Sequence, residues 1–284
     1  MSIWGYCPTQ IRNALNKTPI KNKGDFYDLV ECKSAWINWI SHFSGAETKK
    51  EWAITNGIHD AITHQLNHVR EKYGKIYWFN TDYRFYKVLC LEYNNVGIDS
   101  SRLDLIEPNS YVIVSQPNHE GCITPWFQEL IDICEGNGSK IFLDCAFYGC
   151  TLDTLDTSLE VFDAVAFSLS KNFKMGGTRS GIVFSDSLPL TLTVPISEHF
   201  GYSYFNSFAT EVAKNILPKF GPHYTTRFAK PIQERYCLKN NLTPADIWMW
   251  AFDEFGNKIC ITDDISHLIQ KELDNEPICI CEFY

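Results

Sequence analysis

The sequence predicts an α/β fold: a three-layer α/β/α arrangement around a mostly parallel sheet, followed by a small, reduced C-terminal subdomain. Short apolar runs recur between residues 75 and 184, and helix-like or polar connections separate them, which is the pattern of βα units. Most of these runs are apolar at successive positions, as expected of strands covered on both faces. With 284 residues, 45% of them hydrophobic, the chain can bury a substantial core.

The expected elements follow the hydrophobic spacing along the chain. Helical spacing predicts helices at 11–16, 33–43 and 125–134. An amphipathic helix is also expected after Asn56 or Gly57, one of which would be its N-cap. Apolar runs predict strands at 75–79, 88–93, 111–115, 140–144, 161–167 and from 181 onward.

Three parts are expected along the chain. Residues 1–50 would form an N-terminal arm or lid, residues 51–190 the large domain that holds the sheet, and residues 191–284 the C-terminal subdomain. In the last part the alternation of strands and helices stops. It is replaced by an aromatic-rich segment at 200–208, a helix at 211–217 and apolar runs at 247–252 and 258–262.

Composition argues against several classes of function. The net charge is −9 and no cluster of lysines and arginines offsets it, so a nucleic-acid partner is not expected. No apolar run approaches the ~18 residues of a membrane span, and the N-terminus lacks the pattern of a cleaved leader. We therefore expect a soluble, cytoplasmic protein with no membrane partner.

The 11 cysteines are an odd number scattered through apolar segments, which favours reduced thiols over a disulfide framework. Cys279 and Cys281 are spaced as half of a metal site could be, but alternate residues of a strand-like tail point to one face in any case. Packing is the favoured interpretation of this pair, and no metal site is predicted.

The stretch from Val161 to Phe184 carries the first indication of chemistry. A buried strand is expected to end near Ser168, and Lys171 follows it, with Arg179 eight residues further on. Partial burial disfavours the charged form of a lysine, and a lysine that loses its proton easily can form a Schiff base. The alternative is that Lys171 and Arg179 are solvated cations of a polar loop.

Residues suited to catalysis or ligand binding follow several of the predicted strands. In parallel sheets, ligands bind at these carboxyl ends of the strands. The residues are Asn118 and Gly121 after 111–115, Asp144 at the end of 140–144, Ser168 and Lys171 after 161–167, and Arg179 beyond them. The helix that starts at Gly57 adds backbone N–H groups. If these ends converge, the resulting pocket could hold a cation, a carbonyl group and a phosphate together.

The ordered series NGIHDA, NTDYRFY, SQPNHEG, FLDCAFYG and SLSKNFKMGGTRSG, within residues 53–186, resembles the motifs of a known family. These are the pyridoxal-phosphate enzymes of the aspartate aminotransferase type (fold type I, class I/II aminotransferases), here shortened at the C-terminus. The resemblance implies a pyridoxal 5'-phosphate cofactor, an amino acid or amine as substrate, and a homodimer. In such a dimer the aromatic-rich segment at 200–208 could lie at the subunit interface or in the core.

The resemblance also implies roles for individual residues. Lys171 would form the internal aldimine and then move the α-proton of the substrate. Asp144 would pair with the pyridinium nitrogen, and Tyr83 would stack on the ring. The alternatives are a strand-end cap for Asp144 and a core aromatic for Tyr83.

The phosphate and the phenolic oxygen of the cofactor would have their own partners. Arg179, Ser168 and the backbone N–H groups of Gly57 and Ile58 would bind the phosphate. Asn118 would donate to the phenolic oxygen. Surface exposure remains the alternative for Arg179, helix capping for Gly57 and a plain turn for Asn118.

The chain departs from the family pattern at the cofactor. Phe147 stands where the family has a tyrosine that binds the phenolic oxygen, and Tyr148 is the neighbour that could substitute for it. Without such a donor, the pKa of the internal aldimine should be raised. Thr81 replaces a proline two residues before Tyr83.

A second group of departures concerns the substrate. The family turn Asn-Pro-Thr-Gly carries His119 and Glu120 here, and surface exposure is expected of both. No Ile-Arg motif for a substrate carboxylate stands near the C-terminus, where Arg227 and Arg235 are the only arginines after Arg179. Either one of these two binds the carboxylate, or the substrate is not held through a carboxylate.

An aminotransferase is the leading functional hypothesis. A pyridoxal-phosphate lyase, decarboxylase or other non-transaminating enzyme of a specialised pathway is the second, because the same cofactor chemistry supports cleavage of any bond at Cα. A catalytically reduced binding or regulatory homologue is the third. The presence of Lys171, Asp144 and Arg179 together argues against the third.

Overall fold

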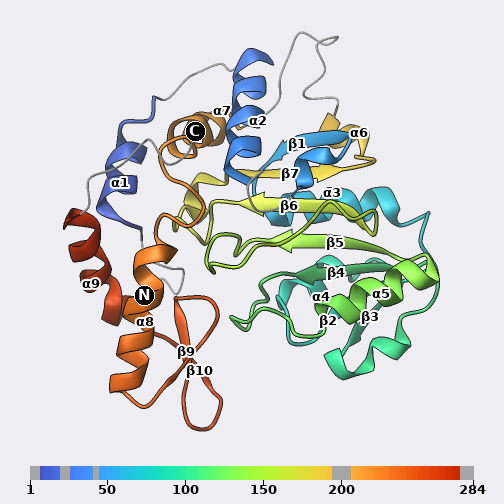
Figure 1. The fold of residues 1–284 in the computed structure, drawn as a ribbon. Helices are drawn as coiled ribbons and strands as arrows, with labels where there is room; N and C mark the ends of the chain where they lie inside the picture. The colour runs from blue at the N-terminus through green and yellow to red at the C-terminus, as the bar shows by residue number, and fades with distance from the viewer. Residues whose placement is uncertain (1–6, 20–25, 41–44, 194–205, 276–284) are drawn as a thin grey trace.

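The computed structural model describes residues 7–19, 26–40, 45–193 and 206–275 (Figure 1). The strands are β1 Glu51–Thr55, β2 Ile76–Phe79, β3 Asn95–Ile98, β4 Tyr111–Ser115, β5 Lys140–Cys145, β6 Phe162–Ser168, β7 Gly181–Ser185, β8 Thr243–Pro244, β9 Trp250–Phe252 and β10 Lys258–Cys260. The helices are α1 Thr9–Asn16, α2 Phe26–Ile40, α3 Ile58–Val69, α4 Phe85–Leu89, α5 Phe127–Asn137, α6 Leu190–Thr193, α7 Ser207–Ile216, α8 Thr226–Lys239 and α9 Thr262–Asn275.

The main sheet has seven strands within the described residues, in the order β1-β7-β6-β5-β4-β2-β3. From β3 to β6 each neighbouring pair is parallel, whereas β7 is antiparallel to both β6 and β1. Ser115 at the end of β4 is in register with Asp144 on β5. The predicted mostly parallel sheet is confirmed, and it brings these two strand ends side by side.

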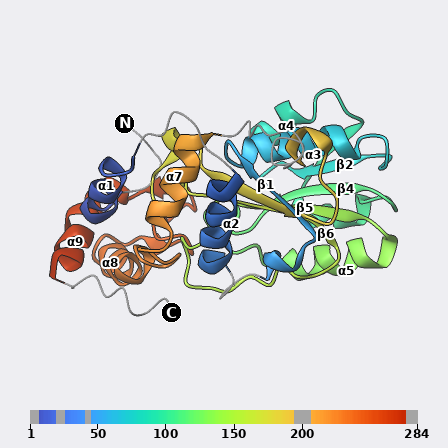
Figure 2. The same cartoon turned by 90° about the horizontal axis from the view of Figure 1, so that it is seen from above.

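Helices cover both faces of the sheet, so the three-layer arrangement is confirmed (Figure 2). The apolar stripe of α3, which includes Ile62 and Leu66, is buried on one face. The apolar side of α5, which includes Leu130 and Cys134, is buried on the other. Strands β4, β6 and β7 are buried at every position, which explains their unbroken apolar sequences.

The predicted strand at 88–93 is wrong. The chain instead forms α4 and a turn, and the edge strand is β3. Tyr86 and Cys90 are fully buried while Val88 and Leu91 are exposed, so the apolar residues lie on two sides of a helical turn. The amide of Asn95 donates to the carbonyl of Cys90 at 2.7 Å and holds this turn against the start of β3.

The edge strand β1 was not predicted, because its sequence EWAIT is short and only partly buried. It pairs with β7, with Thr55 opposite Gly181. This pairing places the following residue pair, Asn56 and Gly57, beside the start of β7. The strand therefore positions the start of α3, which belongs to the candidate site.

The N-terminal helices pack against C-terminal ones. Helix α1 is joined to α9 by a hydrogen bond of 2.9 Å from the Thr9 amide to Gln270 Oε1. Helix α2 is joined to α7 by an ion pair of 2.6 Å between Asp28 and Lys214. The division of the chain at residues 50/51 and 190/191 stays a prediction.

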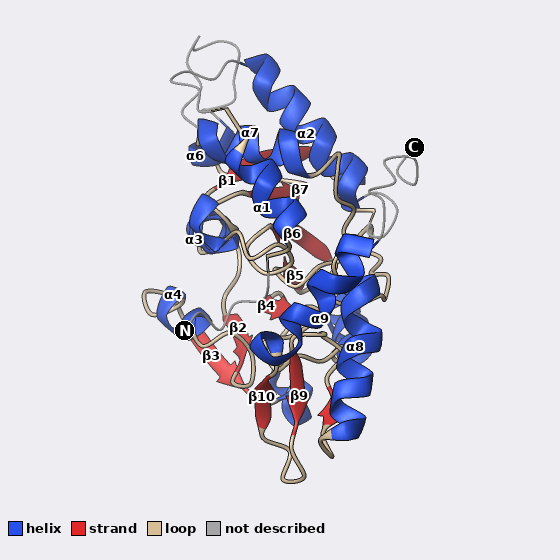
Figure 3. Cartoon of the chain, turned by 90° about the vertical axis from the view of Figure 1, so that its left-hand side faces the viewer, coloured by secondary structure: helices blue, strands red, loops and turns tan. Residues whose placement is uncertain are grey.

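The C-terminal segment adds α8, α9 and a small sheet, ordered β10-β9-β8 in the described part of the chain. The hairpin of β9 and β10 extends away from the main sheet (Figure 3). The nine cysteines within the described ranges are free thiols. Cys279 and Cys281, residues 200–205 and the end of the helix predicted at 33–43 lie outside the described residues.

No helix in the described ranges is both long and apolar enough to cross a membrane. Nor do the described histidine, cysteine and acidic residues include a group of three arranged to hold a metal ion.

Candidate active site

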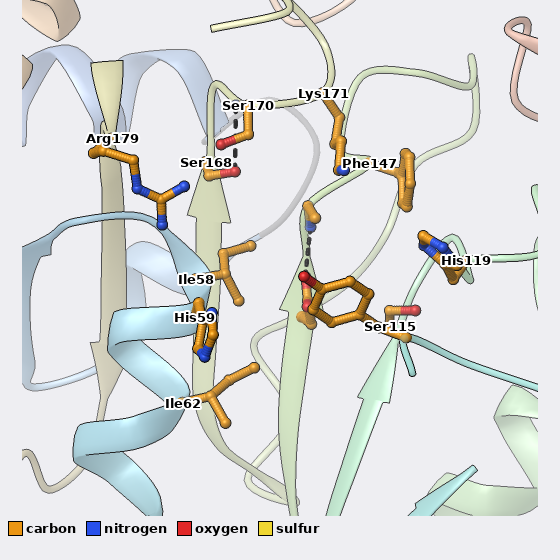
Figure 4. Close-up of a pocket in the computed structure, with 13 residues that line it drawn as sticks. Ile58, His59, Ile62, Ser115, His119, Phe147, Ser168, Ser170, Lys171 and Arg179 are labelled. Carbon is orange, nitrogen blue, oxygen red and sulfur yellow. Dashed lines mark hydrogen bonds between the residues drawn. The ribbon is translucent and has the colours of Figure 1, made fainter. Parts of the chain in front are cut away.

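A pocket lies at the carboxyl ends of β4, β5 and β6 and beside the start of α3 (Figure 4). It encloses about 650 Å³ of empty space, part of which is open solvent. Its lining includes six of the residues predicted from the sequence: Ile58, Tyr83, Asp144, Ser168, Lys171 and Arg179. The strand order explains the meeting, because β4, β5 and β6 are neighbours and end at the same edge of the sheet.

Lys171 lies in the loop after β6 and is partly buried. Burial lowers its pKa to about 8, and the negative charge of Asp144 opposes that shift. At pH 7.5 a group with this pKa is about one quarter neutral, whereas an ordinary lysine is about 0.1% neutral. Its Nζ lies 5.7 Å from the centre of the Phe147 ring. The pocket thus holds an amine that can act as a nucleophile near neutral pH.

Asp144 ends β5 at the base of the pocket and is 5% exposed. Its Oδ2 accepts a hydrogen bond of 2.7 Å from the Tyr86 hydroxyl, and its Oδ1 accepts one of 2.8 Å from the Ala146 amide. Burial raises its pKa to about 6, against the effect of these donors and of Lys171. Asp144 therefore does cap the strand end, and a carboxylate has lone pairs left for a cationic ligand.

A second buried carboxylate stands behind this one and was not predicted. Asp82 is 7% exposed and accepts hydrogen bonds of 2.8 Å from the amides of Ser115 and Tyr83. The hydroxyl of Ser115, which lines the pocket, also donates to Asp82 Oδ1. Burial raises the pKa of Asp82 to about 6. The sequence feature that could have indicated this carboxylate is the position of Asp82, directly before Tyr83 and shortly after a strand.

Arg179 and the start of α3 form the far end of the pocket. Gly57 has a φ of 85° and precedes the first turn of α3, whose leading N–H groups have no partner within the helix. The guanidinium of Arg179 donates to the Asn56 carbonyl at 2.5 Å. A Cβ on Gly57 would lie 3.0 Å from Arg179 Nη2, so the missing side chain makes room for the arginine. A cation and helix N–H groups together suit an anion such as phosphate.

Ser168 is 3% exposed at the end of β6 and lines the same end of the pocket. Its Oγ accepts a hydrogen bond of 3.4 Å from the Ser170 amide. Ser170 also lines the pocket. Two hydroxyl groups therefore accompany the guanidinium of Arg179 there.

Aromatic rings line the opposite side. The His119 ring lies 5.4 Å from Tyr83 and 6.1 Å from Phe147, centre to centre. Trp250, from β9, packs behind them at 5.2 Å from Phe147. The expected surface position of His119 is wrong: the residue lines the pocket, and burial lowers its pKa to about 4. His119 is neutral at pH 7, because Lys258, Lys171 and Arg84 also disfavour its charged form.

Three predicted residues are not part of the pocket lining: Gly57, which lies beside Arg179, and Asn118 and Tyr148. The side-chain oxygen of Asn118 accepts a hydrogen bond of 3.0 Å from the Cys122 amide, within its own turn. The Tyr148 hydroxyl donates to the Ile40 carbonyl at 3.1 Å, on the side of the sheet where α2 lies. Tyr148 therefore does not supply the hydroxyl that Phe147 lacks.

The two late arginines also lie elsewhere. The guanidinium of Arg227 lies 4.8 Å from the centre of the Phe228 ring, and Arg235 is exposed on α8. Neither lines the pocket. Among the residues that the structure describes, the lysine and arginine side chains that line it are those of Lys171 and Arg179.

No family model and no curated protein matches the sequence. Solved structures do match. An aminotransferase from Staphylococcus aureus gives a TM-score of 0.68 at 14% identity over 96% of this chain and 93% of its own. A tyrosine aminotransferase from Leishmania infantum gives 0.65 at 14% over 96% and 90%. The PLP-bound C-S lyase from Staphylococcus hominis, crystallised with L-cycloserine, gives 0.65 at 14% over 88% and 72%.

The chain has the fold of these enzymes. The aminotransferase-like fold predicted from the ordered motifs is thereby confirmed. At this level of identity the likeness is one of fold, and the chemistry of this chain has to be argued from its own residues.

Proposed function

We propose that this protein is a pyridoxal-phosphate enzyme that acts on an amine or amino acid, and that its reaction is transamination. The observation that carries the proposal is the position of Lys171, an amine with a pKa of about 8, above the buried carboxylate of Asp144. The solved structures of the same fold include PLP-bound ones, which supports the choice of cofactor.

The residues of the pocket fit this cofactor at three points. Lys171 suits the aldehyde carbon, Asp144 suits a protonated ring nitrogen, and Arg179 with the start of α3 suits the phosphate. Because Gly57 has no side chain, the guanidinium of Arg179 can occupy the space beside it. When bound, pyridoxal phosphate supplies an electron sink that stabilises negative charge at the substrate Cα.

Each protein group then has a definite task. Lys171, as the neutral amine, would be the group that holds the aldehyde carbon, and its Nζ would be placed to take up and return a proton of the substrate Cα. The carboxylate of Asp144 would hold a proton on the ring nitrogen. Tyr83 would cover the ring, and the lining of Tyr83, His119 and Phe147 would exclude water from the reacting carbon.

Binding of the phosphate would fix the position of the cofactor in the pocket. Arg179 and Ser168 would provide a guanidinium and a hydroxyl. Ile58, the first residue of α3, lines the pocket as well, and Gly57 directly precedes it. The side chain of Asn118 now accepts a hydrogen bond within its own turn. It would bind the phenolic oxygen of the cofactor only if it rotated away from that turn.

A lyase or decarboxylase is the second candidate. The described lining offers a substrate carboxylate no arginine besides Arg179, which the phosphate would occupy, and a C-S lyase shares the fold. Which bond of Cα is aligned with the ring orbitals decides among these reactions. The homodimer and the cytoplasmic location are retained as proposals.

The proposal is tested first by cofactor binding. Wild-type protein mixed with pyridoxal phosphate should gain an absorbance band, and borohydride should fix the cofactor on the peptide that contains Lys171, as seen by mass spectrometry. Lys171→Ala should lose both signals. Lys87→Ala, which changes an exposed lysine of α4, should keep them. A wild-type protein that takes up no cofactor would overturn the proposal.

The reaction is then assigned from products. Incubation with a panel of amino donors and no acceptor should convert bound cofactor to its aminated form, with one oxo product per site. Release of ammonia, carbon dioxide or a sulfur fragment without amination would favour the lyase or decarboxylase. Bound cofactor with no product from any donor would favour the catalytically reduced homologue.

A further inference from the structure

The turn that follows β4 places His119, and not Asn118, in the candidate active site. The Asn118 side chain accepts a hydrogen bond of 3.0 Å from the Cys122 amide and so closes the turn. The next residue, His119, lines the pocket together with Lys171 and Phe147. The polar side chain that this turn offers to a ligand is therefore an imidazole ring.

The His119 ring is positioned by aromatic neighbours. Its centre lies 5.4 Å from that of Tyr83, 6.1 Å from that of Phe147 and 6.2 Å from that of Trp250. These neighbours follow β2, follow β5 and belong to β9, respectively, so they come from segments that are far apart in the sequence. Tertiary packing therefore fixes the orientation of the imidazole ring.

The C-terminal hairpin also holds the backbone of His119. The Nζ of Lys258, on β10, donates to the His119 carbonyl at 2.7 Å, and the same Nζ lies 3.9 Å from Glu120 Oε1. Two residues further on, the Gly121 carbonyl accepts a hydrogen bond of 3.0 Å from the Ile247 amide. The hairpin therefore holds the turn in the position that brings the His119 side chain to the pocket.

The chemical structure of pyridoxal phosphate determines which of its atoms would face His119. On its ring the nitrogen stands opposite the aldehyde carbon, and the phosphate arm and the phenolic oxygen are attached on the two sides of that carbon. Under the proposed function, Lys171 holds the aldehyde carbon, Asp144 the nitrogen and Arg179 the phosphate. Figure 4 shows His119 and Phe147 on the side of Lys171 that is away from Arg179. The phenolic oxygen would therefore face these two residues.

Of these two residues, His119 is the one whose side chain can donate a hydrogen bond. The Phe147 side chain carries no polar atom, whereas a neutral imidazole has one N–H group and one lone pair. Partial burial lowers the pKa of His119 to about 4, and the positive charges of Lys258, Lys171 and Arg84 act in the same direction. The ring is therefore neutral at pH 7, with an N–H group on one of its two nitrogens.

We propose that His119 donates a hydrogen bond to the ionised phenolic oxygen of bound pyridoxal phosphate. This inference rests on the proposed function and adds His119 to the residues that serve it. A donor at the phenolic oxygen stabilises its negative charge, which weakens its attraction for the proton of the covalent linkage between Lys171 and the cofactor. His119 thereby lowers the pKa of this lysine–cofactor linkage, and Phe147 leaves it as a single donor where a tyrosine would add a second.

The first experiment is an absorbance titration of the cofactor-loaded protein. His119→Phe should raise the pKa of the lysine–cofactor linkage by about one unit or more, because a hydrogen bond to a charged group is lost. His119→Asn, whose amide can still donate, should give a value between those of the wild type and His119→Phe. A linkage pKa that is the same in the wild type and in both variants would overturn the proposal.

His59→Phe is the matched control. His59 also lines the pocket, but it belongs to α3 and lies on the side of Lys171 where Arg179 is (Figure 4). The same substitution at this position should leave the linkage pKa near that of the wild type. An equal rise in His59→Phe and His119→Phe would mean that the titration responds to any loss of a polar side chain from the lining, and the assignment to His119 would be wrong.

The second experiment compares two ligands by equilibrium binding: pyridoxal phosphate, and its analogue with a hydrogen in place of the phenolic hydroxyl group. His119→Phe should bind pyridoxal phosphate about tenfold more weakly than the wild type, as expected for one lost hydrogen bond to a charged group. The analogue should bind the two proteins about equally, since it has no oxygen at that position. Equal weakening of both ligands would show that His119 acts by packing alone, which contradicts the proposal.

The two proposals fail in different ways. Wild-type protein that takes up neither pyridoxal phosphate nor the analogue would overturn the proposed function, and the role of His119 would fail with it. If the wild type takes up the cofactor and His119→Phe changes neither the titration nor the preference for pyridoxal phosphate over the analogue, the role of His119 fails while the proposed function stands.

Discussion

Trp250 packs directly against Gly121: a Cβ on Gly121 would lie 2.6 Å from Cε3 of the indole. Gly121 closes the turn after β4, and its φ of +95° is a conformation that other residues rarely adopt. The Ile247 amide donates to the Gly121 carbonyl at 3.0 Å beside this contact. The C-terminal hairpin is therefore held at the turn that carries His119 into the pocket.

Gly121→Ala should separate the hairpin from this turn. We expect a loss of about 2 kcal/mol or more in the free energy of unfolding, because the methyl group overpacks the indole and strains the backbone. Trp250 should also report the change through its fluorescence. Gly136→Ala, in α5 with no atom within 4 Å of the added methyl group, should be neutral or stabilising. Equal denaturation curves for Gly121→Ala and the wild type would contradict this prediction. They would show that the contact between residue 121 and Trp250 rearranges with no loss of stability.

The sequence predicted the sheet well where strands are buried on both faces, as in β4, β5 and β6. Their unbroken apolar runs admit few other structures. It failed at β1 and α4, which lie at the edge or on the surface. There a few apolar residues fit both a strand and a helical turn, and pairing with distant segments decides the outcome.

The part of the candidate site that could be predicted from the sequence is the part that buried strands position. Lys171, Asp144 and Arg179 stand at fixed distances from strand ends, and the strand order alone brings them together. Asp82 and Tyr86 enter the site through tertiary hydrogen bonds that leave no periodic pattern. The direction of Tyr148, towards Ile40, depends on how α2 packs and could not be read from its neighbours in sequence.

Gly57→Ala tests the phosphate end of the pocket. Its φ of 85° and ψ of 177° suit glycine almost alone, and the added Cβ would lie 3.0 Å from Arg179 Nη2. Displacing the guanidinium should weaken the binding of pyridoxal phosphate by at least about tenfold, equivalent to ~1.4 kcal/mol. Pyridoxal, which lacks the phosphate, should bind the two proteins about equally.

Gly177→Ala is the matched control for that substitution. Gly177 lies two residues before Arg179, and an added Cβ would have no atom within 4 Å. Its affinity for pyridoxal phosphate should stay near that of the wild type. If Gly57→Ala lowers the affinity for pyridoxal as much as that for pyridoxal phosphate, the glycine supports the whole pocket rather than the phosphate end.

The pKa of Lys171 predicts how stability depends on pH. The pKa is lowered from 10.5 to about 8, so between these values the unfolded chain binds more protons than the folded one. The free energy of unfolding of the cofactor-free protein should therefore receive a positive contribution as pH rises through this window. Below pH 8 the charged, partly buried ammonium opposes folding, and above 10.5 the difference is gone.

Lys171→Met isolates this contribution. Denaturation of both proteins at pH 7.5, 8.5 and 9.5 gives a difference in which the other titrating groups largely cancel. The variant should be more stable than the wild type at pH 7.5, and the gap should shrink as pH rises. A gap that is independent of pH would mean that Lys171 keeps an ordinary pKa.

Phe147→Tyr tests the departure from the family pattern at the cofactor. Phe147 lines the pocket and would offer no hydrogen bond to the phenolic oxygen of a bound cofactor, and the Tyr148 hydroxyl donates to the Ile40 carbonyl. The raised pKa of the covalent lysine–cofactor linkage therefore stays a prediction. A tyrosine hydroxyl at position 147 would stabilise the ionised oxygen, and a hydrogen bond to a charged group contributes about 1.5–3 kcal/mol.

In Phe147→Tyr this hydrogen-bond energy should lower the pKa of the lysine–cofactor linkage by about one to two units. Absorbance titration of the bound cofactor measures the change. Tyr148→Phe should leave the titration unchanged while it lowers stability by about 1 kcal/mol through loss of the bond to Ile40. The opposite pattern, with the titration moved by Tyr148→Phe and untouched by Phe147→Tyr, would place the phenolic oxygen on the other side of the ring. Phe147 would then be a packing residue, in contact with Trp250 behind the pocket.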